Sequence, residues 1–138
     1  MRKLSLVALA AVLFFACGGN KKTSLVVGDW KIADMAVPMP PVMPDSIKGQ
    51  YEEALKKQVE GMRATSTFNY KADGTYNYNL GGQIGAGTWA INDANTELTL
   101  TEGGKSDVNK VVTLTENKLV IETPQANGAG NLTLTLAK

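Results

Sequence analysis

Residues 68–91 carry the clearest pattern in the chain, an alternation of large hydrophobic and polar side chains that is broken by turn residues. The turn residues are Asp73-Gly74 and Gly81-Gly82, and a period of two bounded by such pairs predicts consecutive antiparallel hairpins. We therefore expect three strands whose large side chains share one face, on which the core is built. These large residues are Phe68, Tyr70, Tyr76, Tyr78, Leu80, Trp89 and Ile91.

The same alternation continues to the end of the chain. Together with a first strand at 25–32, we expect strands at 65–71, 75–80, 84–92, 96–101, 107–115, 118–123 and 131–137. Eight short strands with one apolar and one polar face predict a mostly β fold. We expect an eight-stranded antiparallel up-and-down barrel, since closure removes the sheet edges, with a two-sheet sandwich as the alternative. Inward positions are expected at Leu98, Leu100, Val112, Leu114, Leu119, Ile121, Leu132, Leu134 and Leu136.

One α-helix is expected between strands 1 and 2. Residues 37–44 contain four of the five prolines and exclude a helix or an inner strand there. The period then becomes helical at about residues 46–62, with Asp45 and Ser46 as the expected N-cap. The triplet 45–47 also resembles the short O-glycosylation site of secreted Bacteroidetes proteins, so glycosylation of Ser46 is an alternative. The apolar stripe of this helix is Ile47, Tyr51, Leu55, Val59 and Met62.

The first 16 residues are organised as an export signal, with Arg2 and Lys3 before an apolar run at 4–15. This run is too short to span a bilayer core of about 30 Å. Residues 14–17 resemble a bacterial lipobox, which implies a signal peptide at 1–16 and fatty-acyl (palmitate-like) chains on Cys17. A plain signal peptide with a free thiol is the alternative. We expect a tether at 17–24 and one barrel domain at 25–138.

The net charge and the expected cellular location limit the kinds of partner that the protein can bind. Without Arg2 and Lys3 the chain has 12 basic and 13 acidic residues, a formal charge of −1. Binding of nucleic acid needs a basic patch, so we expect no nucleic-acid partner. The expected partner is the membrane, reached through the N-terminal lipid. Gly18 stands where Asp would signal inner-membrane retention, so we expect an anchor in the outer membrane, with the protein facing the periplasm. We also expect a monomer.

The composition also limits the catalytic and metal-binding chemistry that the chain can support. The chain has no histidine and one cysteine, which excludes Ser-His-Asp and Cys-His catalysis and the usual zinc sites. We therefore expect no enzyme, no cofactor and no metal site. A carboxylate pair for glycoside hydrolysis is the alternative, because the spacing of carboxylates in a barrel is not readable from the sequence. Met35, Met39 and Met43 recur every four residues, and thioethers suit Cu(I). We favour the alternative that they pack a proline-rich segment against the barrel.

Three short motifs add a resemblance to a family. Gly28-Asp29-Trp30, the turn at 73–76 and Gly87-Thr88-Trp89 stand in an order similar to that of the small lipocalin-like lipoproteins of Bacteroidetes. The resemblance covers residues 26–138 and implies a lipocalin-like barrel in which Trp30 has a structural role at one end. Fatty-acid-binding proteins begin similarly, but they hold a carboxylate with inward arginines. Here Arg63 is the only arginine after the leader.

The candidate ligand-binding residues are Phe68, Tyr70, Tyr76, Tyr78 and Trp89. They lie on adjacent predicted strands, and a tyrosine hydroxyl inside a barrel needs a partner that a ligand or water provides. The predicted function is binding of a small apolar or amphipathic ligand in a cavity of roughly 300 Å³ or more. The alternative is a filled barrel, a non-catalytic envelope protein that contacts a partner through its outer face or through residues 37–62.

Overall fold

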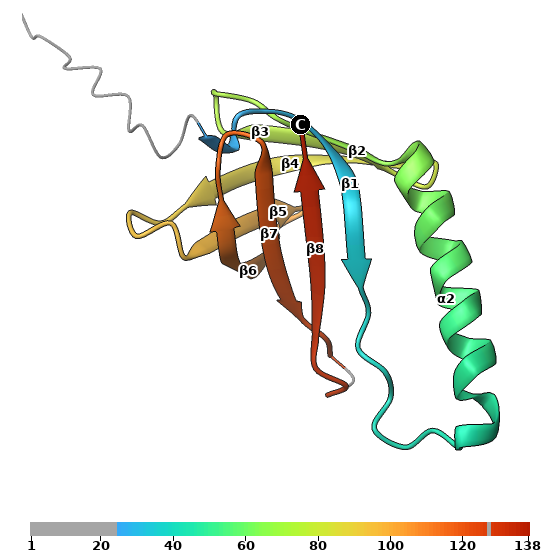
Figure 1. Cartoon of the computed structure of the whole chain (residues 1–138). Coiled ribbons are helices and arrows are strands. Elements are labelled where there is room, and N and C mark those ends of the chain that lie inside the picture. The colour runs from blue at the N-terminus through green and yellow to red at the C-terminus, as the bar shows by residue number, and fades with distance from the viewer. Residues whose placement is uncertain (1–24, 127) are drawn as a thin grey trace, which may run out of the picture.

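The computed structural model describes residues 25–126 and 128–138, which form a closed antiparallel barrel with one helix (Figure 1). The strands follow one another around the ring in sequence order, and β8 pairs with β1. The predicted eight-stranded up-and-down barrel is therefore confirmed and the sandwich excluded. The elements are β1 (Gly28–Ala36), α2 (Asp45–Thr65), β2 (Thr67–Tyr70), β3 (Thr75–Leu80), β4 (Gln83–Ile91), β5 (Glu97–Glu102), β6 (Lys105–Leu114), β7 (Lys118–Pro124) and β8 (Asn131–Ala137).

The predicted leader at 1–16, the acylation site Cys17 and the tether at 17–24 lie outside the described residues. Among the described helices, none has both the length and the apolar character needed to cross a membrane.

Glycine pairs shape two of the hairpins. Gly81 and Gly82 join β3 to β4, and Gly103 and Gly104 join β5 to β6, all with positive φ angles. A two-residue turn with positive φ at both positions matches the twist of the flanking strands, which is why glycine is favoured there. The turn residues of the sequence thus fix which strands are neighbours.

The two ends of the barrel differ. Alternate turns of an up-and-down barrel lie at the same end, so the β2–β3, β4–β5 and β6–β7 turns share one end with the start of β1. We call this the sealed end, because Val26 and Trp30 are completely buried there and the Trp30 Nε1–H donates a 2.7 Å hydrogen bond to the Val26 carbonyl oxygen. The β3–β4, β5–β6 and β7–β8 turns lie at the other end, which we call the open end.

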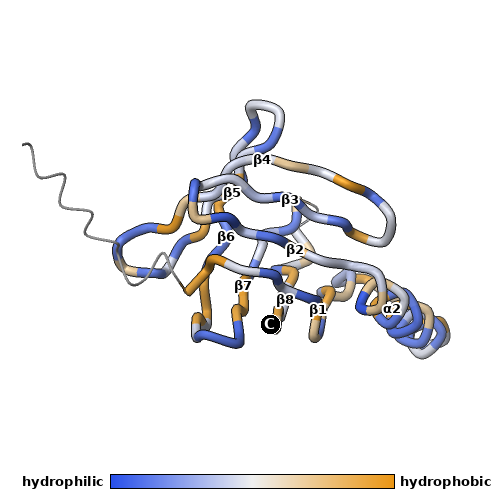
Figure 2. Tube along the Cα trace, turned by 90° about the horizontal axis from the view of Figure 1, so that it is seen from above, coloured by the Kyte–Doolittle hydropathy of each residue, from blue (hydrophilic) through white to orange (hydrophobic). Residues whose placement is uncertain are grey.

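The helix covers the part of β1 that has no β2 partner. β1 pairs with β2 only through Gly28–Lys31, and α2 runs directly into β2 while lying along β1 (Figure 1). Seen from above, α2 lies against one side of the ring of strands (Figure 2). Its apolar stripe meets the barrel with Val59 buried and Leu55 and Met62 half-buried, whereas Ile47 is exposed. The predicted helix is confirmed, and it extends to Thr65.

The start of α2 differs from the predicted cap. Pro44 occupies the N-cap position with φ −58° and ψ 135°, and no side chain makes a capping hydrogen bond. The fixed φ of proline already suits this position, so Asp45 and Ser46 fall inside the first turn. The first strand also differs, because it begins at Gly28 and continues to Ala36, while Leu25 and Val26 are helical. This placement brings Val26 back over Trp30.

One expected core position is wrong. Val112 is 51% exposed, whereas its neighbour Val111 is 8% exposed and faces the interior. The pairing of β6 with β7 shifts between Val111 and Thr113, which is a bulge that inserts one residue and exchanges the faces beyond it. Of the other positions expected to face inward after residue 97, the buried ones are Leu98, Leu119, Ile121, Leu134 and Leu136, and the half-buried ones are Leu100, Leu114 and Leu132.

Candidate functional site

A cavity of about 230 Å³ lies inside the open end of the barrel. It is smaller than the expected 300 Å³, because side chains fill the remainder of the interior toward the sealed end. Inward positions of β2, β3, β5, β6 and β7 supply its walls, so the strand register alone brings them together. The lining residues are Phe68, Tyr76, Tyr78, Leu80, Leu100, Glu102, Asp107, Asn109 and Thr123.

The five candidate ligand residues form one aromatic cluster. The ring centroids of Phe68 and Tyr78 are 6.1 Å apart, those of Tyr78 and Tyr76 are 6.0 Å apart, and those of Tyr76 and Tyr70 are 5.7 Å apart, all stacked. Trp89 closes the series with its ring edge-on to Tyr70 at 6.0 Å. The cluster therefore runs from the cavity into the packed core.

The members of this cluster occupy two levels. Phe68, Tyr76 and Tyr78 line the cavity, whereas Tyr70 and Trp89 are buried beyond it. The Trp89 Nε1–H donates a 2.9 Å hydrogen bond to the Lys71 carbonyl oxygen. The Tyr70 hydroxyl has no hydrogen-bond partner within the described residues, and burial raises the pKa of Tyr70 far above its usual value.

Glycines on β4 make room for the tyrosine rings. Tyr78 stands opposite Gly85 and Tyr76 stands opposite Gly87. A Cβ atom added at Gly85 would overlap the ring of Tyr78, so that ring lies across the bare backbone of β4. This position lets the Tyr78 hydroxyl reach past β4 to a carboxylate on β5. The spacing Gly-x-Gly in β4 is the sequence signal for this arrangement.

Two carboxylates stand at the mouth of the cavity. The Tyr78 O–H donates to the Glu102 carboxylate, with distances of 3.1 Å to Oε2 and 3.3 Å to Oε1. This hydrogen bond is the main cause of a raised pKa of Tyr78, with burial and the Glu102 charge adding to it. Burial, followed by the charge of Glu102, raises the pKa of Tyr76. Both hydroxyls therefore stay protonated at neutral pH; the Tyr78 O–H donates to Glu102, and the Tyr76 O–H can donate to a ligand.

Asn109 and Thr123 form a polar part of the cavity wall, and hydrogen bonds hold Asn109 in place. Its side chain is almost completely buried, its Nδ2–H donates to the Leu98 carbonyl oxygen at 3.3 Å, and its Oδ1 accepts a hydrogen bond from the Thr123 hydroxyl. Sequence reasoning missed Glu102, Asp107, Asn109 and Thr123. Continuing the alternation from Leu100 would have placed Glu102 inside, and the two-residue turn at Gly103-Gly104 then places Asp107 opposite Leu100.

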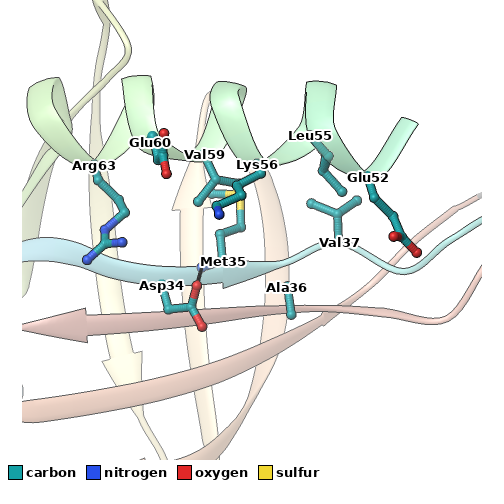
Figure 3. Close-up of a pocket in the computed structure, with 10 residues that line it drawn as sticks. All are labelled: Asp34, Met35, Ala36, Val37, Glu52, Leu55, Lys56, Val59, Glu60 and Arg63. Carbon is teal, nitrogen blue, oxygen red and sulfur yellow. Dashed lines mark hydrogen bonds between the residues drawn. The ribbon is translucent and has the colours of Figure 1, made fainter. Parts of the chain in front are cut away.

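A second hollow of about 330 Å³ lies between α2 and β1 (Figure 3). Leu55 and Val37 point toward one another across it, and Val59 lies over Met35 (Figure 3). Its rim carries charges of both signs and its lining includes no aromatic side chain, so we place the candidate ligand site in the barrel. Arg63 belongs to this outer groove and does not line the interior cavity.

Met35, Met39, Met43 and Ser46 do not line the cavity in the barrel. Met35 packs against the core from β1, while Met39 and Met43 belong to the connection before α2. Within residues 25–126 and 128–138, no group of three or more His, Cys, Asp or Glu side chains is arranged to hold a metal ion. Ser46 is exposed in the first turn of α2, and its glycosylation stays a prediction.

Comparison with known proteins agrees with this architecture. The lipocalin-like domain family matches residues 26–121, which is most of the chain. The crystal structure of a DUF4847 family protein from Bacteroides vulgatus is similar in fold, with a TM-score of 0.50 and 14% identity over 82% of this chain and 93% of that one. No curated protein sequence matches the chain. On the strength of the family match and the closed barrel, the chain belongs to the lipocalin-like domain family.

Proposed function

We propose that the protein is a lipid-anchored binding protein of the bacterial outer membrane, facing the periplasm, which holds a small apolar or amphipathic molecule in the open end of its barrel. The cavity between Phe68, Tyr76 and Tyr78 is the observation that carries this proposal. Aromatic walls with a few convergent polar groups are typical of small-molecule sites. Membership of the lipocalin-like family supports the same function.

The proposed role is binding without catalysis. The ionisable groups of the cavity are the carboxylates of Glu102 and Asp107 and the hydroxyls of Tyr76 and Tyr78. A raised pKa makes these hydroxyls hydrogen-bond donors and poor nucleophiles at neutral pH. Such groups orient an amphipathic ligand and leave its covalent structure unchanged.

Native mass spectrometry tests the binding function. The full-length protein, purified in detergent from its own host, should carry a small molecule that is released on unfolding. Leu100→Trp places a large ring in the cavity and should abolish retention. Val108→Trp is the matched control, because Val108 is on the neighbouring strand, 51% exposed and outside the cavity. Loss of the retained mass in both variants, or no retained mass in the wild type, would contradict the proposal.

The anchor has a separate test. The wild-type protein should sediment with the outer membrane, and its N-terminal peptide should have the mass of an acylated Cys17. Cys17→Ser should release the barrel from the membrane while leaving its circular dichroism spectrum unchanged. A wild-type protein with an unmodified thiol would contradict the anchor and would leave the binding function untouched.

A filled envelope protein that acts through its surface is the second candidate. Val42, in the connection between β1 and α2, is 90% exposed, and Ile47, in the first turn of α2, is 47% exposed. Such apolar side chains favour a partner that covers this segment. Val42→Asp with Ile47→Asp should then abolish capture of a membrane partner by crosslinking, whereas the binding proposal expects no effect of this double variant on the retained small molecule.

A further inference from the structure

We infer that the molecule held in the cavity is an organic cation, an amine or quaternary ammonium group joined to a small apolar part. This inference rests on the proposed binding function and adds the charge of the ligand to it. It comes from the combination of carboxylates, aromatic rings and absent basic side chains in the wall of one cavity.

The charge of the cavity wall is negative. Glu102 at the end of β5 and Asp107 near the start of β6 both line the cavity, and none of its lining residues is a lysine or an arginine. The two carboxylates enter from adjacent strands, since Leu100 is paired with Asp107 and the Glu102 position lies two residues further along β5. A ligand at the mouth therefore meets two negative charges.

The nearby basic residues form no close ion pair with these carboxylates within the described residues. Lys105 is paired in register with Glu102, yet it lies outside the cavity lining, and the described part of the chain contains no ion pair between them. Lys110 is engaged elsewhere, at 3.5 Å from the Glu122 carboxylate. Arg63 lines the groove outside the barrel. The cavity wall itself therefore supplies no positive charge beside the two carboxylates.

The aromatic wall suits the same kind of ligand. The stacked rings of Phe68, Tyr78 and Tyr76 line the cavity beside the carboxylates. The face of an aromatic ring attracts a cation, and aromatic cages are the usual recognition sites of quaternary ammonium groups. The Tyr78–Glu102 hydrogen bond joins the two kinds of wall, because it fixes a carboxylate at the rim of a ring. An apolar ligand part has Leu80 and Leu100 as its neighbours.

An anionic amphiphile fits this wall poorly. A fatty acid held in this cavity would place its carboxylate near the carboxylates of Glu102 and Asp107. Like charges in one site repel one another. A neutral amphiphile would find hydrogen-bond partners but would leave both negative charges unbalanced. The expected order of affinity is therefore cation above neutral molecule above anion.

Three probes of similar shape test this order. They are 2-phenylethylamine, which is cationic at neutral pH, the neutral 2-phenylethanol and the anionic 3-phenylpropionate. Each is titrated into the full-length protein in detergent micelles. The dissociation constant is taken from the NMR shifts of the backbone amides of residues that line the cavity. We expect the amine to bind about tenfold more tightly than the alcohol and the acid to bind most weakly.

Carboxylate variants show whether the cavity causes the preference. Glu102→Gln and Asp107→Asn keep the shape of each side chain, and each should weaken binding of the amine severalfold while leaving binding of the alcohol unchanged. Glu97→Gln is the matched control, since Glu97 lies on the same strand, is exposed and does not line the cavity. The amide spectra of the three variants report at the same time that the barrel is folded.

The outcomes separate the inference from the function on which it rests. Equal affinity for the three probes, or an amine affinity unchanged by both carboxylate variants, overturns the cation inference and leaves the binding function standing. If no probe changes the NMR shifts of the backbone amides around Tyr78 and Leu100, the cation inference fails. The proposal that this cavity binds small molecules is then contradicted as well.

Discussion

The Nζ atom of Lys138 lies 4.6 Å from the centroid of the Trp30 ring, so the final residue of the chain covers the first strand at the sealed end. The same ammonium group donates hydrogen bonds to the carbonyl oxygens of Leu25 at 3.2 Å and of Val27 at 2.8 Å. One side chain thus joins the two ends of the described chain over the buried indole.

Lys138→Gln should lower the stability of the barrel. A cation–π contact made by an exposed cation such as Lys138 contributes about 0.5–1 kcal/mol, and the variant also loses the charge-assisted hydrogen bonds to Leu25 and Val27. We expect the free energy of unfolding in urea to fall by about 1–2 kcal/mol. Lys118→Gln is the control, as Lys118 is an exposed lysine at the same end, and its effect should stay within about 0.5 kcal/mol. Equal effects of the two substitutions would contradict the role of Lys138.

Tyr70→Phe should raise the free energy of unfolding. The Tyr70 hydroxyl is buried without a hydrogen-bond partner among the described residues, and an unsatisfied buried hydroxyl costs about 1–3 kcal/mol. Removing it should stabilise the barrel by about 1 kcal/mol in urea unfolding. Tyr78→Phe is the contrast, because it loses the hydrogen bond to Glu102 and should give no gain. A destabilised Tyr70→Phe variant would show that the hydroxyl has a stabilising role.

The same residue predicts a loss of stability in alkali. Burial, with a smaller effect of Tyr76, raises the pKa of Tyr70 above its usual 10.0. Above that usual value the unfolded chain has lost a proton that the folded chain still holds, so the free energy of unfolding falls as pH rises. The fall is about 1.4 kcal/mol per pH unit for one group. Urea unfolding at about pH 9 and about pH 11 should show a smaller fall for Tyr70→Phe than for the wild type, and identical slopes would refute this.

Gly85→Ala should disturb the wall of the cavity. The new methyl group would overlap the ring of Tyr78, which must then leave its place over β4 and its hydrogen bond to Glu102. We expect a loss of about 1–3 kcal/mol in the free energy of unfolding and loss of the retained ligand. Gly61→Ala is the matched control, because open space surrounds Gly61 in α2, and alanine should stabilise that helix by about 0.5–1 kcal/mol. The two substitutions should therefore have opposite signs.

Local patterns were sufficient to predict most of the fold. Asp73-Gly74, Gly81-Gly82 and Gly103-Gly104 mark hairpins, and the alternation around Trp89 and Leu98 places their side chains inside. These predictions succeed because turn chemistry and a period of two depend on neighbouring residues only. The aromatic cluster was predictable for the same reason, since its five members lie on three consecutive hairpin strands.

The missed positions depend on contacts between distant segments. The bulge at Val111 and Val112 depends on how β6 meets β7, and nothing in the valine pair indicates which residue faces inward. Glu102 and Asp107 look like solvated strand ends in the sequence, which does not show that the Tyr78 ring crosses the bare β4 backbone at Gly85 to reach Glu102. The cap of α2 was misassigned because Pro44 already supplies the required backbone angle.

The sealed end is also the end of the barrel that follows the proposed anchor in the sequence. The described chain begins at Leu25, beside Lys138 and on the side opposite the mouth that carries Glu102. With the proposed anchor at Cys17, the membrane would hold the barrel from the side of Leu25, and the mouth at Glu102 lies at the opposite end of the barrel. Small molecules then enter and leave without passing the attachment surface.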